Sequence, residues 1–94
     1  MKLNHLRSFV LGCFHEDWRL DASSHVDAIG QFVEREPANV VSAVRRELEL
    51  LRATDPSESD LRGLIVGEWN SSYDPCSDGI TMRAWLEEIR DALR

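Results

Sequence analysis

The chain has 94 residues, 43% of them apolar and 30% charged, and its 17 acids outnumber its 11 bases for a formal net charge of −6. This length fits one domain around one hydrophobic core. Nucleic acids and anionic membranes are bound by clustered Lys and Arg, and here one lysine and ten arginines are scattered among acids. The composition therefore argues against direct binding to either.

The two cysteines, Cys13 and Cys76, form no CxxC motif and no disulfide framework, which fits a reducing compartment. The N-terminus lacks the long apolar region of a signal peptide. No apolar run approaches the ~18 residues that a membrane-spanning helix needs. We therefore expect a cytoplasmic protein that has no membrane contact.

Helical spacing of apolar residues begins at the N-terminus. A first helix is predicted from the stripe at Leu3, Leu6, Val10 and Phe14. Gly12 weakens it by about 1 kcal/mol relative to Ala, so we expect it to end near residue 15. Ser23 or Ser24 is expected to cap a second helix, with Asp27 in the position of a capping-box acid. Its apolar face holds Val26, Ile29, Phe32 and Val33.

Two helices are predicted in the middle of the chain. Pro37 ends the second helix and begins a third, whose apolar face holds Val41, Val44, Leu48 and Leu51. Asp55 is expected to cap a fourth helix, with Pro56 at its first position and Glu58 in its first turn. The inner face of that helix holds Leu61, Leu64, Ile65 and Trp69.

Residues 70–79 are rich in Asn, Ser, Asp, Pro and Gly, which predicts a loop. Thr81 is expected to cap a last helix, on which Arg83 and Arg90 can each pair with Glu87. Its apolar face holds Met82, Trp85, Leu86, Ile89 and Leu93. "GLIVGEW" could be a strand, but one strand forms no sheet. The sequence therefore predicts an all-α fold, a single domain over residues 1–94 built as a bundle of about five helices.

The possible metal ligands do not form a motif. They are His5, Cys13, His15, His25 and Cys76. No histidine among them has a partner at helical i,i+3 or i,i+4 spacing. Cys13 could still meet His5 or His25 in three dimensions as a nucleophile and its base. With no other catalytic motif present, we expect no catalytic residue, no metal and no cofactor.

The aromatic residues suggest a core. Phe14, Phe32 and Trp85 fall on apolar stripes, whereas Trp18, Trp69 and Tyr73 lie at helix ends or in a loop. The latter three are either core residues or anchors of a partner interface.

The acids also allow two interpretations: a solvated surface, or one negative patch formed by the stretches around residues 16–21 and 68–78. Asp17 has a third possible role, which is to hydrogen-bond the backbone near Trp18.

Three segments in order carry a family resemblance: "FHEDW", then "REPANVVSAVRRELELLRA", then a Tyr-Asp-Pro before "DGITMRAWLEEIRDAL". Over roughly residues 6–93 the chain resembles the immunity proteins of bacterial contact-dependent growth inhibition systems, in their small helical class. The positions that match are Phe14, Asp17, Trp18, Glu47, Leu48, Leu51, Tyr73, Pro75, Gly79, Trp85, Leu86 and Ile89.

The resemblance implies a non-enzymatic function. Such proteins bind the C-terminal toxin domain of a cognate effector and block its active site or substrate cleft, as monomers in a 1:1 complex. The toxins are frequently nucleases, often tRNases, and a nuclease presents a basic cleft that an acidic inhibitor fits. The alternative is a helical adaptor or regulatory module that binds a host protein.

Because toxin–immunity pairs are specific, we expect the toxin contacts to lie outside the shared positions. The candidate toxin-binding residues are Glu16, Asp21, Asp27, Glu34, Glu36, Glu68, Asp74 and Asp78. The expected structural anchors are Phe14, Asp17, Trp18, Trp85, Leu86 and Ile89. The sequence leaves open whether inhibition occurs at the active site or at an exosite.

Overall fold

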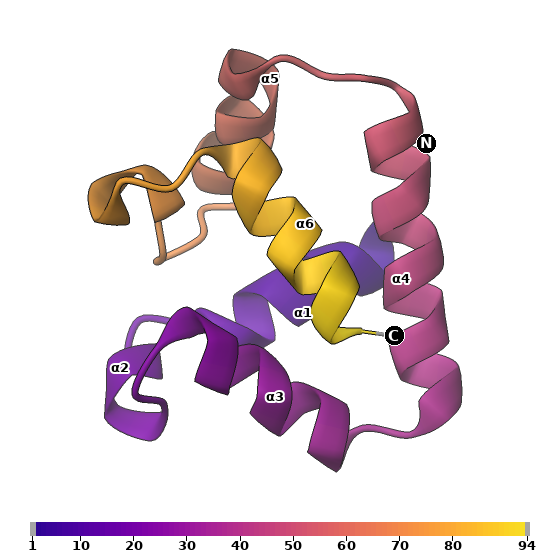
Figure 1. Ribbon diagram of the computed structural model, residues 1–94, viewed down its shortest axis with the longest axis vertical. Helices are drawn as coiled ribbons and strands as arrows, with labels where there is room; N and C mark the ends of the chain where they lie inside the picture. Colours follow the sequence, from indigo (N-terminus) through magenta and orange to yellow (C-terminus); the bar gives the residue numbers. More distant parts are fainter. Residues whose placement is uncertain (1, 94) are drawn as a thin grey trace.

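The computed structural model describes residues 2–93, and within that range every regular element is a helix (Figure 1). In chain order they are α1 (Asn4–Cys13), α2 (Trp18–Asp21), α3 (His25–Arg35), α4 (Ala38–Ala53), α5 (Glu58–Arg62), the π-helical η1 (Gly63–Glu68), the 3₁₀-helical η2 (Pro75–Asp78) and α6 (Met82–Ala92). The all-α prediction is confirmed. Five segments are longer than two turns, because η1 continues directly from α5.

Helix α6 crosses the centre of the view in Figure 1, with α4 to its right, α3 below it and α5 above it. It packs against all three, while α1 packs against α4 and α3. Burial of the apolar stripes against one another drives this arrangement. The largest fully buried side chains include Trp85, Tyr73, Phe9, Phe14, Leu6, Ile29, Leu48, Leu61, Ile65, Met82, Ile89 and Leu93.

Helix α1 is capped by a carboxylate from another helix. Its own N-cap residue, Leu3, offers no side-chain hydrogen bond. Glu47 of α4 fills the gap, because one carboxylate oxygen accepts from the backbone N–H of His5 (2.8 Å) and of Leu6 (3.0 Å). The other oxygen lies 2.5 Å from Nδ1 of His5. These bonds satisfy two unpaired N–H groups of the first turn and tie α1 to α4.

Helix α6 has a cap of the same kind. Thr81 accepts from the backbone N–H of Ala84 at 3.0 Å, as predicted. In addition, the carboxylate of Glu58 in α5 accepts from the N–H groups of Met82 (2.7 Å) and Arg83 (2.9 Å). The beginning of α6 is thereby fixed to the beginning of α5.

The predicted cap of the fourth helix is wrong. Asp55 has a left-handed backbone, with φ of 49°, and its carboxylate lies 2.5 Å from Arg83. Ser57 is the cap of α5, and it forms a capping box with Asp60. Glu58 does lie in the first turn, as expected. The cap moves two residues along because Asp55 is used to end the turn after α4 and to hold α6.

Two smaller expectations change as well. The predicted loop over residues 70–79 contains the turn of 3₁₀ helix η2, in which the carboxylate of Asp74 accepts from the backbone N–H of Cys76 at 3.1 Å. The residues of the expected surface pairs of α6 have other partners. Arg83 contacts Asp55, Glu87 lies 3.7 Å from Arg52 of α4, and Arg90 lies 3.6 Å from its neighbour Asp91.

The cap on α1 can be tested by removing its carboxylate. We expect Glu47→Ala to lower the free energy of unfolding by about 2 kcal/mol, because it leaves two backbone N–H groups unsatisfied at a part-buried helix end. Urea denaturation followed by circular dichroism measures this change.

The matched control is Glu49→Ala. This residue lies two positions after Glu47 on α4, and its exposed carboxylate pairs with Arg52 at 3.0 Å. It should cost less than about 1 kcal/mol, as exposed ion pairs do. Equal losses in the two variants would contradict the cap.

Candidate functional site

Phe14 is the centre of a cluster of four large aromatic side chains. Its ring centroid lies 5.3 Å from Trp18, 5.2 Å from Tyr73 and 5.4 Å from Trp85. These residues come from α2, the segment before η2, and α6, so the cluster joins three parts of the chain to the end of α1. Trp18 and Tyr73 are only 4% and 1% exposed, and Trp69 is buried too. Trp18, Trp69 and Tyr73, which the sequence left as either core residues or interface anchors, are therefore core residues.

A polar network lies along the edge of this cluster. The hydroxyl of Tyr73 donates to the carboxylate of Asp78 at 2.9 Å. Arg19 lies 3.9 Å from the same carboxylate and 4.6 Å from the centre of the Trp18 ring. His25 stacks on Tyr73, with Nδ1 3.4 Å from its hydroxyl and Nε2 2.7 Å from the carboxylate of Glu88. The network connects α2, α3, η2 and α6.

These contacts join Asp78 and Glu88 through Tyr73 and His25, and Gln31 of α3 bonds both the carbonyl oxygen of Asp21 and the carboxylate of Asp27. With Glu16 and Asp17, which precede α2 in the chain, these acids form a set that we call the acidic face: Glu16, Asp17, Asp21, Asp27, Asp78 and Glu88. All six are exposed. Arg19 is the only Lys or Arg within residues 16–27, and it is engaged by Trp18 and Asp78. The face therefore carries a large share of the chain's excess negative charge.

Half of the eight acids predicted to bind a partner lie on this face: Glu16, Asp21, Asp27 and Asp78. Asp21 lies 3.3 Å from His15, and Asp27 accepts from the backbone N–H of Ser23 at 2.9 Å. Ser24 is the cap of α3 and accepts from the N–H of Asp27, but the capping box is incomplete because the carboxylate of Asp27 accepts from Ser23 and not from Ser24.

The other four lie elsewhere. Glu34 and Glu36 lie at the opposite end of α3, and Glu36 is 3.7 Å from Arg35. Glu68 ends η1 and lines a shallow hollow with Lys2 and Arg7. Asp74 is bound to the guanidinium of Arg62, which holds the pKa of that carboxyl below its usual range.

Asp17 occupies the N-cap position of α2, but its side chain forms no capping bond there. The turn is instead held by His15, whose Nδ1 accepts from the backbone N–H of Asp17 at 3.1 Å. The other expected anchors, Phe14, Trp18, Trp85, Leu86 and Ile89, are all buried.

Sequence reasoning missed Glu88 and His25. No prediction named Glu88, and His25 was considered only as a metal ligand or as a base for Cys13. They are 63 positions apart, and only the packing of α3 on α6 brings them together. Local spacing carries no signal for such a contact.

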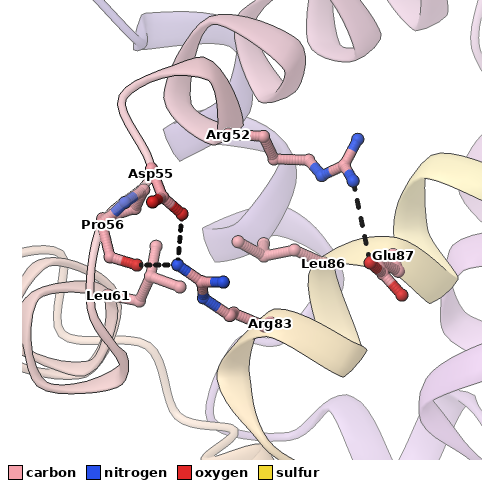
Figure 2. Close-up of a pocket in the computed structure, with 7 residues that line it drawn as sticks. All are labelled: Arg52, Asp55, Pro56, Leu61, Arg83, Leu86 and Glu87. Atoms are coloured by element: carbon pink, nitrogen blue, oxygen red, sulfur yellow. Dashed lines mark hydrogen bonds and ion pairs between the residues drawn. The ribbon is translucent and has the colours of Figure 1, made fainter.

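Figure 2 shows a pocket of about 140 Å³ on the other side of α6, between the end of α4 and the beginning of α5. Leu61 and Leu86 supply its apolar part. Arg83 donates to the carboxylate of Asp55 and to the carbonyl oxygen of Pro56 (2.9 Å), and Arg52 lies against Glu87. Since both guanidinium groups have acidic partners, the pocket has little free charge with which to hold an ion.

A second surface has the opposite charge. Ser42, Arg45, Arg46, Glu49 and Arg90 line a shallow hollow of about 500 Å³ along α4 and α6. We call it the arginine surface. Arg45 and Arg46 are exposed there. The charge of the molecule is thus unevenly distributed, with arginines on α4 and acids around α2.

The geometry does not favour a nucleophile or a metal site. Burial raises the pKa of the Cys13 thiol to about 12, so the thiol stays protonated at neutral pH and is a poor nucleophile. His5 and His25 contact Glu47 and Glu88. Across residues 2–93, no group of three or more His, Cys, Asp or Glu side chains is placed to hold a metal ion. Over the same residues, no helix is both long and apolar enough to cross a membrane.

The chain is similar to known proteins in two comparisons. A family model described as CdiI immunity protein matches residues 2–93. Among solved structures, a chain in the "Crystal structure of CdiA-CT/CdiI complex from Y. kristensenii 33638" superposes with a TM-score of 0.92, over 100% of both chains, at 16% sequence identity. At that identity the second likeness shows the fold. No curated protein sequence matches the chain.

Tyr73 reports directly on the aromatic cluster, because it is the one tyrosine of the chain. Burial raises the pKa of its hydroxyl well above the ordinary value of 10.0, and the carboxylate of Asp78 raises it further. Because the folded protein holds this proton more tightly than the unfolded chain does, the protonated hydroxyl stabilises the fold. This stabilisation is fully present below about pH 10, and it is lost as the pH rises through the higher pKa of the folded state.

We therefore expect no tyrosinate absorbance at 295 nm while the protein stays folded at pH 10 to 11. Asp78→Asn should bring ionisation to lower pH. Half-ionisation near pH 10 with an unchanged far-UV circular dichroism spectrum would contradict the buried geometry.

Proposed function

This chain belongs to the CdiI immunity protein family, and we propose that it binds the C-terminal toxin domain of a cognate contact-dependent growth inhibition effector and neutralises it. The fold supports this proposal, since the solved structure it resembles over its whole length comes from a CdiA-CT/CdiI complex. The protein acts by binding, without catalysis, metal or cofactor.

The acidic face is the observation that supports a proposal about the kind of toxin and how it is blocked. Six exposed acids face solvent, with Arg19 engaged by Trp18 and Asp78, and with Arg35 in the same hollow as Asp21. A nuclease must present Lys and Arg to phosphates, so its cleft complements such a surface. We propose that the toxin is a nuclease, possible substrates including tRNA, and that the acidic face covers its cleft or the entrance to it.

We assign the central contacts to Glu16, Asp21, Asp27 and Asp78, together with Asp17 and Glu88 beside them. Glu34, Glu36, Glu68 and Asp74 lie away from this face, and we place them outside the central contact. The complex is 1:1 and forms in the cytoplasm, where the toxin reaches its substrate. Attraction between opposite charges accelerates its formation, which suits an inhibitor that must act before damage accumulates.

The first test is co-expression with the C-terminal domain of the effector encoded directly upstream. We expect this domain alone to stop growth, and this chain to restore growth and to co-purify with the domain. A harmless domain, or one that this chain does not bind, would contradict the proposal and favour a helical adaptor for a host protein.

A charge-matched pair of variants tests the acidic face. Glu16→Gln with Asp21→Asn removes two negative charges from it. We expect the association rate with the toxin domain to fall by roughly three- to tenfold at low salt, with a weaker dependence on salt. Stopped-flow fluorescence at two ionic strengths measures both quantities.

The control, Glu49→Gln with Glu87→Gln, removes the same charge from the two partners of Arg52 on α4 and α6. It should leave the association rate within about twofold of the unchanged protein. Equal effects of the two pairs would mean that only net charge matters, and would remove the acidic face from the proposal.

A further inference from the structure

Leu20 is the most exposed large hydrophobic side chain in the part of the chain that the structure describes. Its exposure is 83%, compared with 54% for Val26 and 48% for Leu50. It lies in α2, between Arg19 and Asp21, and so among the charges of the acidic face. A leucine almost entirely in water contributes nothing to the core of this chain.

The backbone around Leu20 is nevertheless well fixed. Trp18 and Ala22, two positions to either side, are both buried. The N–H of Leu20 donates to the carbonyl oxygen of Asp17 at 2.9 Å. The side-chain amide of Gln31 in α3 donates to the backbone carbonyl oxygen of Asp21 at 2.8 Å. A side chain held outward from a fixed turn loses little backbone freedom when it enters a partner, which favours tight binding.

The surroundings define the chemistry of that partner. Acids flank Leu20 along the chain at Asp17 and Asp21, and Arg19 adds Asp78 from η2. An exposed apolar side chain flanked by charges fits an interface with an apolar centre and a polar rim. The complementary surface is an apolar socket rimmed by Lys and Arg.

We propose that Leu20 is the apolar anchor of the toxin interface and inserts into such a socket on the toxin domain; this rests on the proposed function. A second copy of this chain is a poorer occupant. Its arginine surface has no apolar residue in its lining. The pocket beside Leu61 and Leu86 does have an apolar part, but its two arginines are already paired with Asp55 and Glu87.

The anchor and the acids have different kinetic roles. Charges act over distance and set the association rate, whereas a buried apolar contact forms late and sets the dissociation rate. Truncation of Leu20 should therefore change the lifetime of the complex and leave its rate of formation nearly unchanged.

The experiment measures surface-plasmon-resonance kinetics of the full chain on the immobilised C-terminal toxin domain of the upstream effector. For Leu20→Ala we expect dissociation at least tenfold faster and association within about twofold. Leu20→Asp should weaken binding further, despite adding negative charge toward a basic partner. The matched control is Leu50→Ala, which truncates an exposed leucine of α4, and its kinetics should equal those of the unchanged chain. Thermal melts should be the same for all three variants.

The two proposals fail in different ways. If the unchanged chain binds and protects, and Leu20→Ala binds equally well, the anchor is overturned while the immunity function stands. If the unchanged chain does not bind the toxin domain, both proposals are overturned. If the chain sediments as a dimer that Leu20→Ala converts to a monomer, the occupant is a second copy and the inference is wrong.

Discussion

The packing of Phe14 against Trp18, Tyr73 and Trp85 is the constraint on which the functional surface depends. Helix α2 is a single turn, and η2 is another, and turns of this length are not stable by themselves in water. Trp18 and Tyr73 hold them in place by burying their rings against Phe14 at the end of α1 and Trp85 in the first turn of α6. The acids on these two turns are therefore positioned by the aromatic core beneath them.

Acidic residues have two distinct roles in this chain. Glu47 and Glu58 lie between helices, where their carboxylates complete the first turns of α1 and α6. The acids of the acidic face lie in water and leave most of their charge available to a partner. Net charge does not distinguish the two roles, because a carboxylate that accepts backbone N–H groups contributes as much to the formal −6 as an exposed one. Glu47 and Glu58 serve the fold, whereas the acids of the acidic face serve binding of the toxin domain.

Sequence periodicity predicted the helices well, since the apolar stripes through Leu48 and Ile89 are local patterns that repeat along one helix. The Thr81 cap follows from local chemistry and was also predictable. The cap at Ser57 was missed because Asp55 is recruited by Arg83, which is 28 positions away. The acidic face was predicted only in part for the same reason. Asp78 was among the predicted acids, but Glu68 and Asp74 of the same stretch lie elsewhere. Glu88 was missed, because it joins the face through His25, a contact that spacing does not encode.

Hydrogen exchange of this chain, free and bound to the toxin domain, tests the location of the interface most directly. Helices α2 and η2 are single turns and open more readily than the long helices, so their exchange in the free protein is fast enough for a change to be seen. Slower exchange in residues 15–27 and 74–79 on binding, with residues 42–52 of α4 unchanged, is the result we expect. Slowing confined to residues 42–52 would place the partner on the arginine surface and contradict the assignment of the acidic face.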